Sequence, residues 1–82
     1  MNSAIYKSTR KPDCYLYIER PNDFARVPSS LLAMLGELEF VMEITLGAER
    51  KLAQSDPLVV MAQLQEQGFY LQMPRTFYRI ST

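Results

Sequence analysis

The residues best suited to chemistry are cations and aromatic rings in the first predicted hairpin. Lys7, Arg10 and Lys11 lie there, beside Tyr6 and opposite two further tyrosines. Cations next to aromatic rings on a sheet can bind single-stranded nucleic acid or nucleotides, since phosphates meet the cations while bases stack on the rings. The alternative is a hairpin kept soluble by its charge, with tyrosines packed under a helix. We favour it because the aromatic signature motifs of sheet-based RNA binders are absent.

A further cation lies in the segment "DFARVP", where Phe24 and Val27 anchor the chain before a predicted helix. Arg26 in this segment is exposed or paired with a carboxylate in the simplest interpretation, and anion binding near the helix start is the alternative. The candidate binding residues from the sequence are therefore Tyr6, Lys7, Arg10, Lys11, Tyr15, Tyr17 and Arg26.

Catalytic and metal-binding groups are scarce. The chain has no histidine, which removes the commonest general base and the commonest transition-metal ligand. Cys14 is the single cysteine, so it forms no internal disulfide, no zinc site and no pair with a histidine. We expect it to be buried beside Leu16 and Ile18, where a thiol behaves as a small hydrophobe. The three glycines are far apart and read as stops and turns. No catalytic residue, metal ligand or cofactor is predicted.

Carboxylates offer the remaining route to an enzyme. Glu39 and Glu43 are expected on the same side of a strand, but roughly 13 Å apart at the usual rise per residue. An enzyme could use Glu43 or Asp56, yet an unpaired surface carboxylate is a weak base. We therefore expect solvated charges and no enzymatic activity.

Composition indicates one small globular domain. The chain has 82 residues, of which 48% are hydrophobic, and nine Lys and Arg balance nine Asp and Glu. This balance gives no support to nonspecific nucleic-acid binding or to a polybasic membrane anchor. The N-terminal residues lack the apolar run of a signal peptide, and all apolar runs are short. We expect a reducing, cytoplasmic setting.

Periodicity and turn residues predict six elements. Strands are expected at 2–8 and 14–19, forming a hairpin, and at 38–46 and 69–73. A short helix follows Pro28 and ends at Gly36, and a second begins at Asp56-Pro57 and ends at Gly68. Residues 48–54 read as a turn of helix, and 75–82 have no clear pattern. The order β-β-α-β-α-β predicts an α+β fold with a mainly antiparallel sheet of at least four strands.

Both faces of this sheet are apolar enough to need cover. One face is expected to hold Cys14, Leu16, Ile18 and the alternating row Leu38 to Leu46, and the other Tyr15, Tyr17, Val41 and one side of the last strand. A helix on each face is the simplest solution, and the short first helix leaves some aromatic surface exposed. Three apolar residues near the end of the chain could cover that surface, add a strand, or dock on a second copy to form a homodimer: Phe77, Tyr78 and Ile80.

Four segments in order, "YLYIE", "DFARVPSSLL", "ERKLAQSD" and "GFYLQMP", give the chain a resemblance to the YcgL domain family, small bacterial domains of uncharacterised function. The resemblance covers about residues 4 to 74. It implies a sheet with helices on both sides, and it supplies no activity and no catalytic residues. Relatives tend to continue into a Pro-rich polar tail, whereas "PRTFYRIST" is short and aromatic. We therefore expect a single domain at 1–74 and a tail at 75–82.

Three functions remain open. The first is a non-enzymatic cytoplasmic domain that binds another protein, or a second copy, through the tyrosine face and the hairpin. The second is a binder of single-stranded nucleic acid or nucleotides that uses the same tyrosines with Lys7, Arg10 and Lys11. The third is a small carboxylate enzyme.

Overall fold

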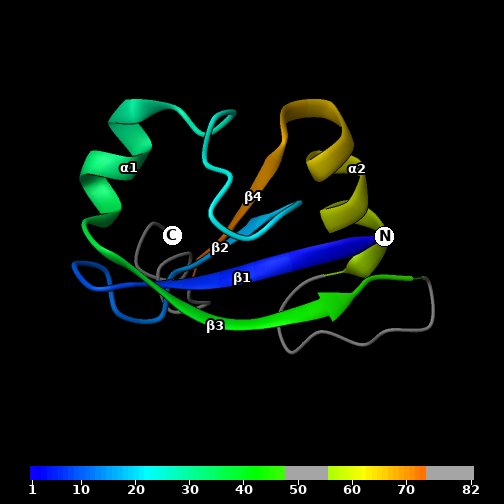
Figure 1. Cartoon of the computed structure of the whole chain (residues 1–82), viewed down its shortest axis with the longest axis horizontal. Coiled ribbons are helices and arrows are strands. Elements are labelled where there is room, and N and C mark those ends of the chain that lie inside the picture. Colours follow the sequence, from blue (N-terminus) through cyan, green and yellow to red (C-terminus); the bar gives the residue numbers. More distant parts are fainter. Residues whose placement is uncertain (48–55, 74–82) are drawn as a thin grey trace, which may run out of the picture.

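The computed structural model describes residues 1–47 and 56–73, which form a sheet and two helices (Figure 1). The elements are β1 Asn2–Ser8, β2 Tyr15–Ile18, α1 Ser29–Leu35, β3 Leu38–Thr45, α2 Pro57–Gln67 and β4 Phe69–Gln72. This order confirms the predicted β-β-α-β-α-β arrangement, with boundaries that differ by at most one or two residues. Two expectations, a helical turn at 48–54 and the nature of the tail at 75–82, lie outside the described residues.

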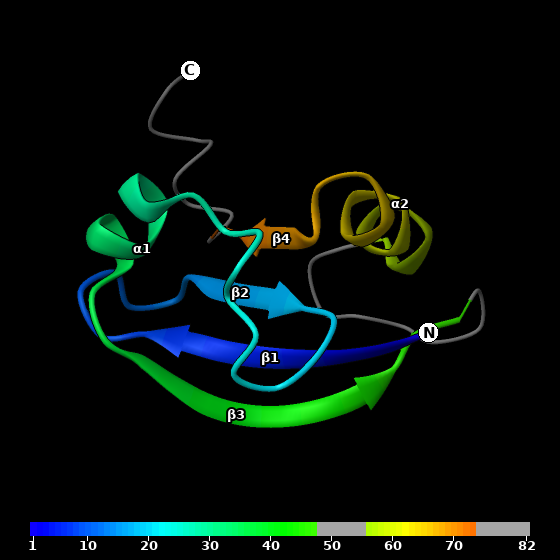
Figure 2. The same cartoon turned by 45° about the horizontal axis from the view of Figure 1, so that its top comes forward.

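The sheet has the order β3-β1-β2-β4, and every neighbouring pair is antiparallel. The predicted hairpin is confirmed, with Ala4 opposite Ile18 and Lys7 opposite Tyr15. Figure 2 shows β3 and β4 as the two outermost strands. Among the described residues, each of these strands therefore has a sheet neighbour on one side only.

Local chemistry sets the ends of both helices as the sequence predicts. The Asp56 carboxylate accepts a hydrogen bond of 2.9 Å from the backbone N–H of Leu58, and Pro57 occupies the first helical position of α2. Gly68 ends α2 with φ of 86°, a left-handed conformation that glycine adopts without steric cost. Gly36 follows α1 with φ of 72°.

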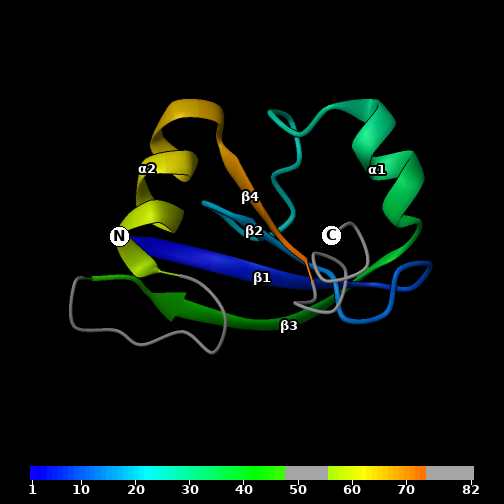
Figure 3. The same ribbon diagram turned by 180° about the vertical axis from the view of Figure 1, so that it is seen from behind.

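The core consists of two clusters separated by the sheet. The α1 cluster lies on one face and the α2 cluster on the other, and Figures 1 and 3 place the helices at opposite ends of the molecule. The helix on each face thus confirms the expected architecture. Buried members of the α1 cluster are Ala4, Tyr6, Cys14, Leu16, Ile18, Val27 and Leu35; those of the α2 cluster are Ile5, Tyr17, Ile44, Leu46, Val60 and Leu64.

The prediction that Leu38 to Leu46 alternate along one face of β3 is wrong, because a β-bulge moves the residues after it to the other face. Ile5 of β1 is opposite Met42, but the next residue, Tyr6, is opposite Phe40, so Val41 is an extra residue. Since opposite residues share a face, Phe40 lies on the α1 face and Met42 on the α2 face. Ile44 accordingly packs with Tyr17 in the α2 cluster, not with Leu16 and Ile18.

Candidate functional site

The cations of the first hairpin have different surroundings. Lys7 is exposed on the α2 face, with Tyr15 opposite it on β2 and Glu39 opposite it on β3. Lys11 is also exposed, and its backbone N–H donates to the Ser8 hydroxyl at 2.9 Å. These two lysines, the exposed Arg10 and the half-buried Tyr15 are the part of the predicted binding set that keeps accessible surface around the hairpin.

Arg10, in the same turn, lies against the end of α1. Its guanidinium donates to the carbonyl of Ala33 at 3.3 Å, and its backbone N–H donates to the carbonyl of Leu35. The stem of the Arg10 side chain passes directly over Gly36. A Cβ at position 36 would lie 2.6 Å from Arg10 Cγ, which is closer than van der Waals contact, so a larger residue does not fit there without moving the arginine. The side chain thus supports the carboxyl end of a helix, where a cation also complements the helix dipole.

The tyrosines do not form one exposed surface. Tyr6 and Tyr17 are both only 4% exposed and belong to opposite faces of the sheet. The Tyr6 hydroxyl accepts a hydrogen bond of 2.8 Å from the backbone N–H of Asn22, and its ring makes an edge contact with Phe24. Because both rings are core residues, neither is available as a flat stacking platform for a base.

Tyr17 is held in place by its hydroxyl as well as by its ring. The hydroxyl donates to the Gln72 side-chain oxygen at 3.0 Å in a buried contact, and the ring meets Tyr70 edge-on. Burial raises the pKa of Tyr17 above its usual 10.0, and neighbouring Tyr70 acts in the same direction. The contact joins β2 to the edge strand β4 below α2.

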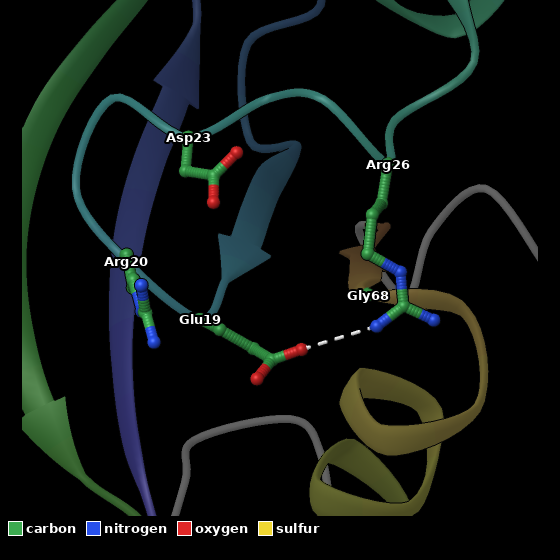
Figure 4. Close-up of a pocket in the computed structure, with 5 residues that line it drawn as sticks. All are labelled: Glu19, Arg20, Asp23, Arg26 and Gly68. Atoms are coloured by element: carbon green, nitrogen blue, oxygen red, sulfur yellow. Dashed lines mark hydrogen bonds and ion pairs between the residues drawn. The ribbon is translucent and has the colours of Figure 1, made fainter.

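A small pocket surrounds Arg26 (Figure 4). It has a volume of about 130 Å³ and is lined by Glu19, Arg20, Asp23, Arg26 and Gly68. Glu19 and Arg26 point toward one another, with 3.4 Å between Oε1 and Nη1. Arg26 Nη2 also donates to the carbonyl of Glu66 at 3.2 Å. Two carboxylates balance two guanidinium groups here, so the pocket does not concentrate charge of one sign.

Arg26 repeats at α2 what Arg10 does at α1. A Cβ at Gly68 would lie 2.6 Å from Arg26 Cδ, so this arginine also crosses a helix-ending glycine. Both predicted binding arginines therefore have structural partners at helix ends. Part of this arrangement is visible in the sequence, because each helix is followed by a glycine and has no basic residue in its last turn. The arginine that packs on each glycine comes from a distant segment of the chain.

Exposed apolar residues gather on the outer strand of the sheet, a surface that alternation along the sequence did not predict. We define the β3 edge as residues 39–43, in which Phe40, Val41 and Met42 are 55%, 46% and 44% exposed. Glu39 and Glu43 flank them and are also exposed. Because of the bulge these carboxylates lie on opposite faces of the sheet, not on the same side as expected. Neither forms an ion pair with any residue of the described ranges.

Reactive groups do not converge in the part of the chain that the structure describes. That part contains no set of three His, Cys, Asp or Glu side chains able to hold a metal ion. Cys14 is buried, and burial raises the pKa of its thiol, an effect that the positive charge of Lys11 partly offsets. Asp56 is engaged as the cap of α2. Neither α1 nor α2 has the length and apolar character needed to cross a membrane.

A four-stranded antiparallel sheet with one helix on each face, two separate core clusters and an apolar outer strand defines a small α+β sandwich domain. The family model described as the YcgL domain matches residues 3–75, which is most of the chain. The chain therefore belongs to the YcgL domain family, as the four segments of the sequence predict.

The chain is similar to bacterial proteins of different lengths. A YcgL domain-containing protein of Stenotrophomonas maltophilia is 49% identical over 74 residues, which is 90% of this chain and 86% of the relative. One from Thioalkalivibrio sulfidiphilus is 50% identical over 74 residues, covering 90% of this chain and 91% of the relative. A protein of Nitrosococcus oceani named "Putative HAD-like hydrolase" is 50% identical over 78 residues, 95% of this chain but 21% of the relative.

Proposed function

We propose that this domain is a non-enzymatic protein-interaction module of the cytoplasm that accepts an extended segment of its partner as an additional strand along β3. The observation that carries this proposal is the β3 edge, where three successive apolar side chains are about half exposed on a strand that has one sheet neighbour within residues 1–47 and 56–73. An incoming strand would form backbone hydrogen bonds with β3 and cover these side chains.

The arrangement of the three apolar residues suits strand addition better than a flat contact. The bulge directs Phe40 to one face of the sheet and Met42 to the other, with Val41 between them. A partner strand placed alongside β3 touches both faces at once, because its own side chains alternate. Covering the exposed part of each side chain contributes about 1 kcal/mol, since complete burial of such residues contributes about 1.5–3 kcal/mol.

Charge restricts which strand fits. Glu39 and Glu43 flank the apolar residues, so an acidic segment is repelled and a basic one attracted. Because the bulge places Glu39 and Glu43 on opposite faces of the sheet, each face of the β3 edge carries one of these charges. We therefore infer that the partner segment is extended, apolar and basic.

The longer relative supports a protein partner over a nucleic acid. In the Nitrosococcus oceani protein, the matching segment is 21% of a chain named as a HAD-like hydrolase. In that relative, the segment similar to this chain is joined to further polypeptide, which is why we favour a protein partner. We extend this to the present chain as part of the proposal, without extending the activity that the name describes.

Nucleic-acid binding is the less favoured function, because buried rings cannot stack on bases and one of its three cations is engaged at a helix end. Tyr6 and Tyr17 are buried, and Arg10 lies across Gly36. Lys7 and Lys11 remain exposed. Fluorescence anisotropy with a single-stranded oligonucleotide at low salt tests this alternative. Binding that weakens with salt and is lost on Lys7→Glu and Lys11→Glu substitution would favour it over strand addition.

The test of the favoured function uses peptides selected from a random display library on the full chain, followed by two matched variants. Val41→Lys places a cation on the β3 edge, whereas Val59→Lys makes the same change on α2, at a residue with almost the same exposure, 48% against 46%. We expect selected peptides to be rich in Arg, Lys and apolar residues, to bind Val41→Lys at least about tenfold more weakly, a loss of about 1.4 kcal/mol, and to bind Val59→Lys as they bind wild type. Acidic peptides, or equal effects of the two variants, would overturn the proposal.

A further inference from the structure

We propose, resting on the function just described, that the β3 edge recognises a partner strand by the spacing of its charges. The preferred segment has two basic residues separated by two apolar ones, so that four successive residues follow the pattern basic, apolar, apolar, basic. Composition alone does not set this spacing. The β-bulge sets it, because it places the two carboxylates of the edge on opposite faces of the sheet.

β1 shows how a strand without a bulge pairs with this edge. Four successive residues of β1, residues 4–7, span the whole edge and skip Val41. Their partners in β3 are Glu43, Met42, Phe40 and Glu39. A strand that adds to the outer side of β3 meets the same side chains, so four of its successive residues face the edge. Because these residues alternate between the two faces, the first and the fourth lie on opposite faces.

Each face of the edge offers one apolar side chain and one carboxylate. On the α1 face these are Glu43 and Phe40, whose ring meets Tyr6 edge-on with 5.6 Å between the centroids. On the α2 face they are Met42 and Glu39. An incoming side chain interacts with the one directly opposite it on the same face. The outer two of the four incoming residues therefore meet carboxylates, and the inner two meet apolar side chains.

A partner with its basic residues four positions apart fits this edge less well. Such a strand would suit a β3 without a bulge, where Glu39 and Glu43 would share one face. On the observed edge, a strand that sets its first basic residue opposite Glu39 brings an apolar residue opposite Glu43. Its second basic residue then falls opposite Ile44. One charge pair and one apolar contact are lost.

The two carboxylates differ in what lies opposite them on β1. Glu39 is opposite Lys7, whose positive charge offsets part of its own, whereas Glu43 is opposite the buried Ala4. Neither carboxylate forms an ion pair with another residue of 1–47 or 56–73. The basic residue that meets Glu43 should therefore contribute more to binding than the one that meets Glu39.

The experiment compares two labelled synthetic peptides of equal length and composition, titrated with the full chain and followed by fluorescence anisotropy. In the close-spaced peptide, two lysines flank an adjacent pair of valines, with threonines outside. In the wide-spaced peptide, one of these threonines stands between the valines. We expect the close-spaced peptide to bind about tenfold more tightly, because the other loses a charge pair and an apolar contact.

Variants of the chain locate this preference on the edge. With Glu39→Lys and Glu43→Lys together, a close-spaced peptide that carries glutamates should bind more tightly than the one that carries lysines. Glu66→Lys, which changes an exposed carboxylate of α2, should leave the wild-type preference intact. Glu43→Gln should weaken binding of the close-spaced lysine peptide by about two- to fivefold, and Glu39→Gln by less.

The outcomes separate this inference from the proposed function. Equal binding of the two lysine peptides, or a double variant that still prefers lysines, would overturn the spacing. If neither synthetic peptide binds, but library peptides bind and respond to Val41→Lys, the spacing fails and the interaction module stands. If library peptides respond equally to Val41→Lys and Val59→Lys, the module itself fails.

Discussion

The contact between Arg10 and Gly36 gives a quantitative test of the fold. Gly36 has φ of 72° and ψ of −151°, a region that is essentially restricted to glycine. A Cβ there would also lie 2.6 Å from Cγ and 2.9 Å from Cδ of Arg10. Gly36→Ala therefore meets two separate penalties, one in the backbone and one against the arginine stem.

The expected magnitude follows from these two terms. Backbone conformations of this kind cost about 1–3 kcal/mol for a residue with a side chain. Displacing Arg10 breaks its hydrogen bond to the carbonyl of Ala33, an exposed contact of about 0.5–1 kcal/mol. Gly36→Ala should thus lower the free energy of unfolding by about 1.5–4 kcal/mol, a large part of the ~4–12 kcal/mol typical of a chain this size.

Chemical denaturation of a double-mutant cycle measures both terms. We expect Gly36→Ala to cost about 0.5–1 kcal/mol less in an Arg10→Ala background, because the arginine stem and its hydrogen bond are already gone. The matched control is Gly47→Ala, where an added Cβ meets nothing within 4 Å and φ is not positive. This control should change stability by less than about 0.5 kcal/mol.

Two results would refute the reasoning. If Gly36→Ala and Gly47→Ala had equal effects, the special backbone conformation at Gly36 would be wrong. If Gly36→Ala had the same cost with and without Arg10, the backbone term would stand, but the arginine would not cross the glycine as described.

Two further predictions concern buried groups. Tyr17→Phe removes the hydroxyl that donates to Gln72 and should cost about 0.5–1.5 kcal/mol in urea denaturation; a stability equal to wild type would contradict the buried contact. Because burial raises the pKa of Tyr17, the native state retains this proton at pH values where the unfolded state loses it. Titration of Tyr17 therefore leaves the free energy of unfolding unchanged below about pH 10 and lowers it above that pH. The loss of stability at alkaline pH should accordingly be smaller in Tyr17→Phe. The thiol of Cys14, buried with a raised pKa, should react with an alkylating reagent far more slowly in native protein than in denaturant, and equal rates would show that it is exposed.

Local signals predicted most of the elements, because the residues that begin and end them act within a few positions. Asp56, Pro57 and Gly68 together specify α2, and each has the role that its type predicts. Pro28 and Gly36 do the same for α1. The hairpin and the distribution of helices over both faces also followed from periodicity, since neighbouring residues of β2 alternate between the two core clusters.

The contacts that define the candidate site depend on residues far apart in the chain. Alternation of Phe40 and Met42 indicates one shared face, and only the pairing with β1 reveals the extra residue between them. The exposed β3 edge was therefore missed. Arg10 and Arg26 looked like free cations because nothing near them in the sequence shows that each crosses a glycine of a distant helix end. Whether Lys7, Lys11 and Tyr15 bind a ligand stays a prediction.

The division of the core by the sheet has a consequence for how the molecule opens. The described members of the α2 cluster make their apolar contacts on one side of the sheet, and those of the α1 cluster on the other, so apolar packing ties each helix to the strands and not to the other helix. Detachment of α2 would expose Val60 and Leu64 while leaving Leu35 in place. Native-state hydrogen exchange should accordingly resolve two opening reactions, in which amides of one helix lose protection while the other helix and the central strands β1 and β2 retain theirs.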